Sequence, residues 1–385
     1  MNRRPSFAQV AIVGTVGLPA GYGGFETLAA NLVLYAERHN MPCAIDVYCS
    51  GRAYPDRSAE WHGAQLRYVP LDANGAISPL YDFWSMLLAG WRGADAILVL
   101  GVSGAVALPL LRLLTRSRYI VNVDGIEWRR EKWSRLASRF LRLSEAFAAR
   151  FAHVVISDNQ AIVDHIQDSY GRSSVLIPYG GDHAADAGGS MIEATEIVAN
   201  SWERYALMLC RIEPENNVHV ILDSFARDLA LPLVAVGNWQ ASDYGRELKQ
   251  RYGDHPNIRL LDPIFETRPL HALRSGAEIY VHGHSAGGTN PSLVEMMYLA
   301  KPVIAYDCAY NRHSTENRAV YFKNAADLAN VTMTLGSRDI EGDGRAMAEI
   351  AHRRYSWEKI GRAYYDLLLT GSGAKLSESP PACER

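Results

Sequence analysis

Short runs of consecutive apolar residues alternate along the chain with segments whose apolar positions recur every three or four residues. In the first half the runs cover residues 9–14, 44–48, 96–100, 119–123 and 153–156. Continuous hydrophobicity is typical of strands buried on both faces, so these runs predict a parallel sheet covered by helices. The first half of the chain is therefore expected to fold as an α/β domain.

The same pattern returns after residues 179–200, a stretch with several Gly, Ala and Asp residues and no clear period. Apolar runs at 205–210, 233–236, 258–261, 279–282 and 302–306 predict strands, and residues 218–229 and 290–299 have helical spacing. We expect two doubly wound α/β domains in series, at residues 1–185 and 200–352. Closing helices are predicted at 345–354 and 356–369, and a disordered tail rich in Gly, Ser, Pro and charge at 371–385.

The composition is that of a globular protein of 385 residues, with 48% hydrophobic and 21% charged positions. Lys and Arg total 39 against 42 Asp and Glu, a formal charge of −3 that argues against nucleic acid as the main partner. The five cysteines include no CxxC pair, so neither a disulfide framework nor a zinc knuckle is expected. We expect a cytoplasmic location, because the first residues lack a signal-peptide core and the apolar stretches fall short of the roughly 18–20 residues of a membrane span.

A glycine-rich loop, GTVGLPAGYGGFE at residues 14–26, follows the first strand and precedes a helical pattern at 27–38. Glycines such as Gly23 and Gly24 let the backbone approach a ligand, and the start of a helix offers N–H groups to an anion. The segment predicts a phosphate-binding loop, and the alternative is a tight turn without a ligand. Its spacing does not match GxGxxG, so dinucleotide binding has little support.

Polar residues also follow the strand at 119–123, in the segment DGIEWRREKW at 124–133. Open α/β sheets bind ligands at the carboxyl ends of their strands, so Asp124 is a candidate polar or catalytic anchor. In the alternative interpretation Asp124 caps the following helix, and Glu127 and Arg130 pair on a solvated face.

Residues 129–150 carry seven cations against two acids, with apolar residues interleaved at helical spacing. A basic amphipathic helix of this kind can lie on anionic lipid. The alternative is a helix that packs its apolar face inward and leaves the rest in water.

In the second half, the strand at 205–210 is followed by Arg211, beside a predicted helix start. A guanidinium in this position can hold a diphosphate through two hydrogen bonds. The alternative is an ion pair on the surface with Glu213 or Glu215.

The segment with the most candidate site residues is VHGHSAGGTNPSLVEMM at 281–297. Here a predicted strand leads into a glycine-rich loop, and Pro291 lies at the start of a new helix. Ser292 lies near the helix start, where N–H groups suit a diphosphate, and Glu295 lies one turn in, where a carboxylate can accept hydrogen bonds from ribose hydroxyls. The alternative is a plain loop with Glu295 on a solvated helix. His282 and His284 lack a third ligand nearby, so no metal site is expected.

Six segments together resemble the retaining nucleotide-sugar glycosyltransferases of family 4, and within them a subgroup of bacterial rhamnosyltransferase-like enzymes. They span residues 9 to 369 and read AIVGTVGLPAGYGGFETLAANL, VDGIEWRREKW, IPYGGD, CRIEPENN, HGHSAGGTNPSLVEMMYLAKPVIAYD and YSWEKIGRAYYDLL. The resemblance implies the GT-B architecture, in which two Rossmann-like domains face each other across a cleft. It also implies that a crossover helix at 353–370 returns to the first domain.

Carried over position by position, the resemblance implies roles for the matching residues. Arg211 would hold the diphosphate of the donor, Ser292 and Leu293 would offer it backbone N–H groups, and Glu295 would bind the ribose. Gly23 and Gly24 would approach from across the cleft. The candidate catalytic residues are Asp124, Arg211 and Glu295. Further candidates are Asn217, Thr289 and Asn290 on the donor side, and Tyr22, Glu127 and Trp128 on the acceptor side.

The chain departs from the wider family at two positions. Many members have a lysine where this chain has Asn216, and a glutamate where it has Gly287. The first change removes a charge from the diphosphate site, and the second removes a carboxylate that would bind sugar hydroxyls. A donor with fewer or differently placed hydroxyls is therefore expected, such as the 6-deoxy sugar of dTDP-rhamnose.

The resemblance predicts a retaining hexosyltransferase without an obligatory metal or other cofactor. It would move a 6-deoxyhexose such as rhamnose from a nucleotide-diphosphate donor to a saccharide or lipid-linked acceptor in bacterial surface-polysaccharide biosynthesis. The basic segment at 129–150 adds a predicted peripheral contact with the inner face of an anionic membrane. The alternatives are a sugar-nucleotide epimerase on the same fold and a non-catalytic nucleotide-sugar-binding subunit of an assembly complex.

Overall fold

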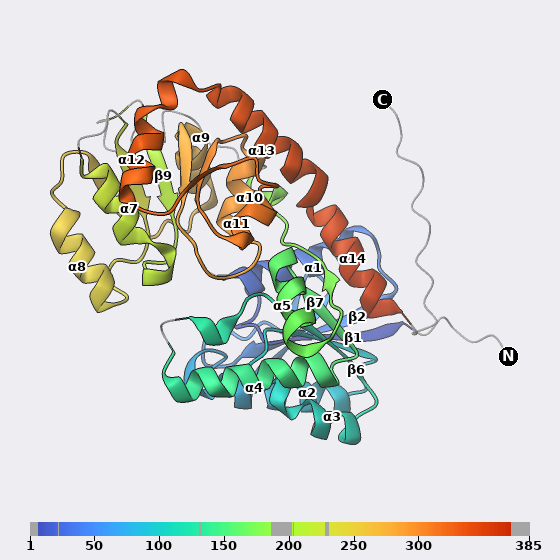
Figure 1. The fold of residues 1–385 in the computed structure, drawn as a ribbon. Coiled ribbons are helices and arrows are strands. Elements are labelled where there is room, and N and C mark those ends of the chain that lie inside the picture. The colour runs from blue at the N-terminus through green and yellow to red at the C-terminus, as the bar shows by residue number, and fades with distance from the viewer. Residues whose placement is uncertain are drawn as a thin grey trace, which may run out of the picture.

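The computed structural model of the protein describes residues 7–21, 23–130, 133–185, 202, 204–227 and 231–370. The structured part forms two α/β domains, one above the other in Figure 1, and the predicted tail at 371–385 lies outside the described residues. In the described part of the chain, no helix has both the length and the apolar character needed to cross a membrane.

The first domain is built on a mainly parallel sheet. Its strands are β1 (Ala8–Val13), β2 (Cys43–Ser50), β3 (Glu60–Trp61), β4 (Ala64–Val69), β5 (Ala96–Leu100), β6 (Arg118–Val123), β7 (Val154–Ser157) and β8 (Val175–Leu176). Their order is β3-β4-β2-β1-β5-β6-β7-β8, and the β3–β4 pair is antiparallel. Because β1 lies between β2 and β5, the topological switch point is at the carboxyl end of β1.

Helices cover both faces of this sheet. The first face is covered by α1 (Gly24–Arg38) and by the last helix of the chain, α14 (Trp357–Leu369). The other face is covered by α2 (Ser78–Trp91), α3 (Leu108–Leu114), α4 (Arg135–Phe151) and α5 (Gln160–Tyr170). In Figure 1, α2, α3 and α4 lie side by side on the side of the first domain away from the second.

The second domain repeats the plan on a smaller scale. Its parallel strands are β9 (Ala206–Leu209), β10 (Leu233–Val236), β11 (Ile258–Leu261), β12 (Ile279–His282), β13 (Val303–Tyr306) and β14 (Val320–Phe322), in the order β11-β10-β9-β12-β13-β14. Its helices are α7 (Val218–Phe225), α8 (Asp243–Tyr252), α9 (Thr267–Gly276), α10 (Pro291–Tyr298), α11 (Ala309–Ser314), α12 (Ala325–Met333) and α13 (Ile340–Arg354). Here β9 lies at the switch point, between β10 and β12.

Short 3₁₀ helices punctuate the loops of both domains. They cover Gly75–Ile77, Ala105–Ala107, Glu127–Arg129, Asp182–Ala184, Pro214–Asn216 and Leu335–Ser337.

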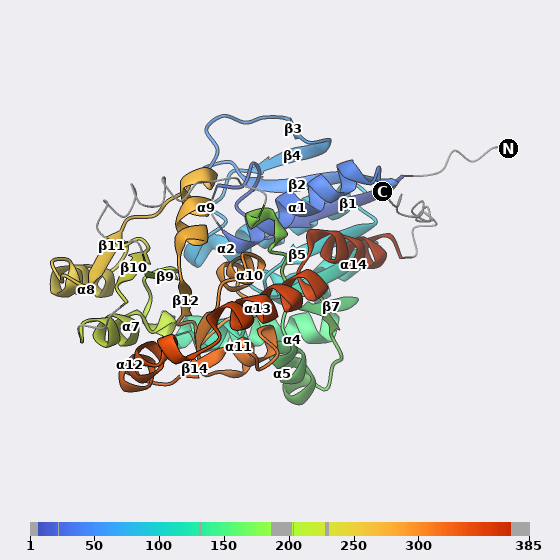
Figure 2. The same ribbon diagram turned by 90° about the horizontal axis from the view of Figure 1, so that it is seen from above.

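The chain returns to the first domain at its end, as predicted. Helix α13 belongs to the second domain and leads into α14, which lies over the first sheet (Figure 2). The amide of Asn122 in β6 donates to the Tyr364 hydroxyl at 2.7 Å, and the Tyr365 hydroxyl donates to the Leu32 carbonyl of α1 at 2.9 Å. Both bonds are buried, so α14 is an integral layer of the first domain.

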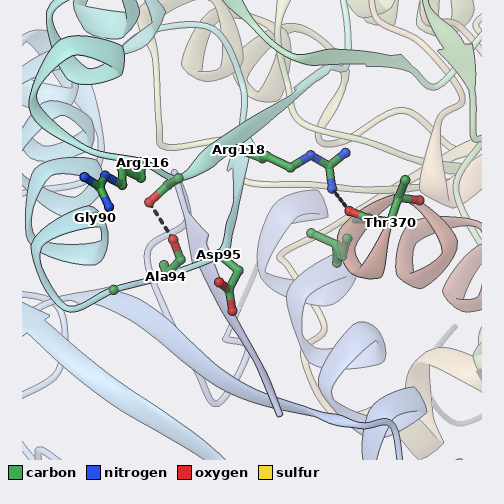
Figure 3. Close-up of a pocket in the computed structure, with 9 residues that line it drawn as sticks. Gly90, Ala94, Asp95, Arg116, Arg118 and Thr370 are labelled. Atoms are coloured by element: carbon green, nitrogen blue, oxygen red, sulfur yellow. Dashed lines mark hydrogen bonds between the residues drawn. The ribbon is translucent and has the colours of Figure 1, made fainter. Parts of the chain in front are cut away.

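A surface cavity of about 270 Å³ marks where α14 ends against the first domain (Figure 3). The Arg118 guanidinium, at the start of β6, donates to the carbonyls of Leu367 and Thr370, and the Ser117 hydroxyl donates to the Ala94 carbonyl at 2.6 Å. The cavity lies at the amino ends of β5 and β6, opposite the strand ends where open α/β sheets bind ligands. We assign it to docking of the helix terminus.

Several elements were missed or misplaced by the apolar pattern. Strand β4 was not predicted because polar residues alternate with its apolar ones, which is typical of a strand near a sheet edge. Helices α2 and α3 were likewise not predicted. The basic helix α4 begins at Arg135 rather than at 129, because Ser134 caps it by accepting a hydrogen bond from the Ala137 amide at 3.3 Å. Helix α13 begins at Ile340, five residues before the predicted start.

Candidate active site

Loops after β1 and β6 of the first domain meet the loop after β12 of the second domain. A Cβ atom added to Gly125, after β6, would lie 3.2 Å from the Cα of Gly287, after β12. A Cβ added to Gly24, at the start of α1, would lie 3.8 Å from Cγ of Pro291, at the start of α10. Gly24 therefore lies beside the start of α10, and its predicted approach to a donor stays a prediction.

The glycine-rich loop after β1 is organised by Glu26, a residue that sequence reasoning missed. Oε1 of Glu26 accepts hydrogen bonds from the Val16 amide at 2.7 Å and from the Thr15 hydroxyl at 3.0 Å. Gly23 has φ 149°, and a Cβ added there would lie 1.8 Å from Oε2 of Glu26. The loop therefore already surrounds one carboxyl group of its own, and Gly23 is required by that packing. Tyr22 lies outside the described residues.

Arg130 forms a bridge between the domains and was also missed as a site residue. Its Nε atom lies 2.8 Å from Oε1 of Glu127, and its Nη1 atom lies 3.4 Å from Oε1 of Glu215 on the second domain. The Glu127–Arg130 pair foreseen on a solvated face therefore exists, but both side chains are largely buried. The carboxyl group of Glu127, which is predicted on the acceptor side, instead holds Arg130 in this bridge.

Asp124 lies in the same acidic and basic cluster, half-buried after β6. Burial raises its pKa to about 6, with a further upward contribution from Glu127 and opposing contributions from Arg130 and Arg211. A group that titrates near neutral pH beside a cleft is a typical functional candidate. The structure shows no capping bond from Asp124 to a helix among the contacts it describes, so the capping interpretation loses its support.

Asp158, after β7, ties the first domain to the predicted donor loop. Its Oδ2 atom accepts a hydrogen bond from the Thr289 amide at 3.1 Å, and the Thr289 hydroxyl donates to the Asp158 carbonyl. Burial raises the pKa of Asp158 well above its ordinary value, and the nearby Asp124 raises it further. Thr289 is thus placed by a contact from across the cleft, which only the tertiary structure reveals.

The Asp124→Asn variant is expected to raise the free energy of unfolding by roughly 2 kcal/mol near pH 7.5 and by much less near pH 4. The pKa of Asp124 is about 6 in the folded chain against an ordinary 3.8. Ionisation in the folded state is therefore unfavourable, and its cost appears as the pH rises through that interval. Urea unfolding at both pH values, with Asp164→Asn on α5 as an exposed control, measures the effect. A gain of equal size at both pH values would contradict the assignment.

Arg211 extends from the end of β9 with its guanidinium in solvent. The side chain is 49% exposed, and its Nη1 atom lies 3.9 Å from Oε1 of Glu213. This distance marks a loose ion pair, so the guanidinium has donors free to meet an anionic ligand. The amide of Asn216, at the position of the family lysine, donates to the Arg211 carbonyl at 2.7 Å, and that of Asn217 donates to the Gly283 carbonyl at 2.8 Å. Both asparagines shape the loop.

The start of α10 is capped by the side chain of Asn290, the residue just before the helix. Oδ1 of Asn290 accepts hydrogen bonds from the Ser292 amide at 3.2 Å and from the Ser292 hydroxyl at 2.9 Å, and the Leu293 amide donates to the Asn290 carbonyl at 3.1 Å. The Tyr280 hydroxyl in turn donates to Ser292 Oγ at 2.8 Å. The N–H groups predicted to face a diphosphate are therefore engaged by Asn290 here, and a ligand would have to take the place of that cap.

The two histidines of the donor loop are buried and stacked. The rings of His282 and His284 lie 4.4 Å apart between centroids and 12° from parallel. Burial lowers the pKa of His282 to about 3 and that of His284 well below its ordinary value, so both rings are neutral at physiological pH. In the described ranges, no three or more His, Cys, Asp or Glu side chains are grouped to hold a metal ion.

Glu295 is buried on α10 and belongs to a chain of polar contacts that the sequence did not reveal. Its Oε2 atom pairs with the Arg274 guanidinium of α9, and its Oε1 atom lies 3.1 Å from Nε2 of His183. The indole N–H of Trp357, the first residue of α14, donates to Nδ1 of His183 at 2.9 Å, which leaves the ring proton on Nε2. Burial raises the pKa of Glu295, but Arg274 and His183 outweigh it, and the carboxylate is ionised.

The indole N–H group of Trp128, which is predicted on the acceptor side, forms a hydrogen bond within the protein. Its indole N–H donates to Oε1 of the buried Glu145 at 3.1 Å, and His165 and Tyr170 donate to the same oxygen, each at 2.7 Å. The guanidinium of Arg142 lies 5.1 Å from the indole ring centroid. An acceptor would therefore meet the ring of Trp128 rather than its N–H group.

Family models match two parts of the chain. Residues 193–332 match the model described as glycosyl transferases group 1, and residues 109–182 match a model described as a domain of unknown function, DUF1972. No curated protein matches the sequence significantly.

Solved structures match nearly the whole chain. HepE from Anabaena in complex with UDP is 16% identical, with a TM-score of 0.69 over 94% of this chain and 100% of that one. Sucrose-phosphate synthase from Thermosynechococcus elongatus is 15% identical, with a TM-score of 0.78 over 96% and 100%. HepE in complex with UDP-glucose is 17% identical, with a TM-score of 0.70 over 94% and 99%.

The likeness to these structures establishes the fold. The chain has the GT-B fold with two Rossmann-like parallel-sheet domains, which confirms the predicted fold class. The family match lies on the second domain, whose residues up to 332 resemble the glycosyl transferases of group 1.

Proposed function

We propose that this protein is a retaining glycosyltransferase that moves a sugar from a nucleotide-diphosphate donor to a saccharide or lipid-linked acceptor in bacterial surface-polysaccharide biosynthesis. One observation carries the proposal: the half-exposed guanidinium of Arg211 extends from the switch-point strand of a domain that matches group 1 glycosyltransferases. The ionised Glu295 lies on the neighbouring helix α10. A cation for the diphosphate and a carboxylate for the ribose are the two groups that a nucleotide-sugar site needs.

The proposed chemistry breaks the bond between the anomeric carbon and the diphosphate oxygen and forms a bond from the same carbon to the acceptor hydroxyl. Negative charge that develops on the diphosphate is stabilised by Arg211. The departing phosphate oxygen takes the proton of the acceptor hydroxyl, so no protein base is required. Asp124 positions that hydroxyl or stabilises positive charge on the sugar ring. No metal is needed in this scheme, and transfer is expected to persist in EDTA.

For the donor sugar, we propose a 6-deoxyhexose such as rhamnose, with dTDP-rhamnose as one candidate donor. The support is local. Gly287 stands where the resembling family has a carboxylate for sugar hydroxyls, and it has φ 116° with open space around its Cβ position. A site that has one hydrogen-bonding side chain fewer suits a sugar that lacks one hydroxyl group. HepE was solved with UDP-glucose, which supports a nucleotide-sugar donor but a different sugar.

The non-catalytic alternative rests on the same two positions. Asn216 and Gly287 remove a cation and a carboxylate, so the protein could bind a nucleotide sugar as a subunit of an assembly complex without turning it over. The epimerase alternative has no observation of its own in its favour, and it enters as an outcome of the test.

The test is a panel of nucleotide sugars incubated with the purified full chain and lipid-linked or oligosaccharide acceptors, followed by mass spectrometry. A glycosylated product and free nucleotide diphosphate are expected, with the anomeric configuration of the donor kept in the product, as read by NMR. A new donor isomer formed without acceptor would indicate an epimerase. Donor binding without product from any acceptor would indicate a binding subunit.

A further inference from the structure

Helices α2, α3 and α4 expose large apolar side chains on the outer side of the first domain. On α2 the exposed residues are Leu80, Trp84 and Trp91, which lie four and seven residues apart and so share one stripe of the helix. Exposed tryptophans at this spacing are unusual on a surface that faces only water.

The adjoining helices continue this surface. Leu113 on α3 is 85% exposed, with Leu110 and Leu114 beside it, and Leu136 on α4 is 77% exposed, with Leu143 two turns further along. Helix α3 contacts both α2 and α4, and the three lie together on the side of the first domain away from the second (Figure 1). The alternative in which α4 packs its apolar face inward and leaves the rest in water does not account for the exposed Leu136 and Leu143.

The exposed charges of these three helices have one sign. Within α2, α3 and α4 the acidic residues are Asp82 and Glu145, and both are buried. The exposed charged residues of the three helices are Arg112, Arg135, Arg139, Arg142 and Arg150. The segment after α2 adds Arg92 and Asp95, and the segment after α3 adds Arg116. The whole chain has a formal charge of −3, so the positive charge of these helices is a local feature of one face.

We propose that this outer face of α2, α3 and α4, which we name the docking face, binds the surface of an anionic lipid bilayer. Exposed leucines can enter the boundary between headgroups and acyl chains, tryptophans favour the interfacial depth, and arginines pair with anionic headgroups. The basic charge complements an acidic partner. The protruding leucines suit a lipid surface better than the phosphate backbone of a nucleic acid, which is bound through cations.

The docking face also reaches the candidate site. The 3₁₀ helix Glu127–Arg129 packs against α4, and Trp128 donates to Glu145 of that helix. The acceptor side of the cleft therefore adjoins the face that would contact lipid. Binding to lipid does not require the proposed transfer reaction, and it can be tested without donor or acceptor.

The test is flotation of the full-length chain with vesicles of phosphatidylcholine containing about a third phosphatidylglycerol, at about 0.05 M and about 0.5 M salt. We expect binding at low salt, loss of most of it at high salt, and none to pure phosphatidylcholine. Replacing Arg135 and Arg139 with alanine should lower the partition coefficient by about twenty-five-fold, at roughly fivefold for each cation. Leu113→Asp with Leu136→Asp should lower it by at least about tenfold.

Matched controls lie on the second domain. Arg259→Ala with Arg318→Ala removes the same charge elsewhere, and Met333→Asp alters an equally exposed apolar residue on α12. These variants should bind vesicles as the unmodified chain does, and thermal unfolding checks that all variants fold. Absence of binding at low salt, or equal losses in test and control variants, would overturn the proposal. So would a dimer in sedimentation that Leu113→Asp with Leu136→Asp dissolves, because the face would then join two copies of this chain.

Discussion

Replacing Arg211 with alanine is expected to lower kcat/KM for sugar transfer by about a hundredfold or more. The reason is that charge builds on the departing diphosphate in the transition state, and Arg211 is the cation that the second domain offers to it. Its side chain is 49% exposed and only loosely paired with Glu213, so the substitution removes little from the folded protein. Steady-state kinetics with the donor found in the panel, together with thermal unfolding, gives both values.

Arg211→Lys is the matched control for charge. Lysine keeps the positive charge but loses the planar pair of donors that suits a diphosphate, so we expect it to recover only part of the activity. Arg259→Ala on β11 removes an exposed arginine from the same domain and should leave transfer unchanged. If Arg211→Ala forms product at the rate of the unmodified chain, the proposed role of the guanidinium is wrong.

Replacing Glu295 with alanine is expected to reduce the free energy of unfolding by about 3–5 kcal/mol and to abolish detectable transfer. The carboxylate pairs with the largely buried guanidinium of Arg274 and contacts His183, so the variant leaves a buried cation without its partner. Urea unfolding measures the loss of stability, and calorimetric titration with the nucleoside diphosphate measures the loss of ligand affinity.

A double variant separates these two effects. Arg274→Met with Glu295→Leu replaces the buried pair with apolar residues of similar size, which often restores stability. We expect it to fold nearly as stably as the unmodified chain and still fail to bind the nucleotide, since no carboxylate remains for the ribose. Nucleotide affinity equal to that of the unmodified chain would show that Glu295 has only a structural role.

The pattern of apolar runs was sufficient for the central strands of both sheets but not for every strand near an edge. Strands β5, β10 and β12 match their predicted ranges, because residues buried on both faces leave an uninterrupted apolar signal. The edge strand β11 also matches its predicted range, although Arg259 within it is exposed. Strand β4 has Gln65 and Arg67 between its apolar residues, and the two-residue strand β3 leaves almost no pattern. Burial of a strand on both faces thus favours its prediction but is not required for it.

The candidate site was predictable where one residue carries the signal and not where two distant residues share it. Arg211 follows directly from its place after a buried strand. Arg130, Asp158, His183 and Arg274 matter because of partners that are 85, 131, 112 and 21 residues away along the chain. Nothing in local spacing reveals such pairs. Glu26 is intermediate, because an acid in the first turn after a glycine-rich loop could have been read as a partner for that loop.

The contact chain from Trp357 through His183 connects the last helix to Glu295, the carboxylate that we propose binds the ribose. Trp357 begins α14, and the same helix is held on the first domain by the hydrogen bond between Tyr364 and Asn122. With the role proposed for Glu295, a displacement of α14 would change the orientation of the carboxylate, and by reciprocity a bound nucleotide would strengthen the attachment of the helix. The position of α14 and the occupancy of the donor site would then form one thermodynamic equilibrium.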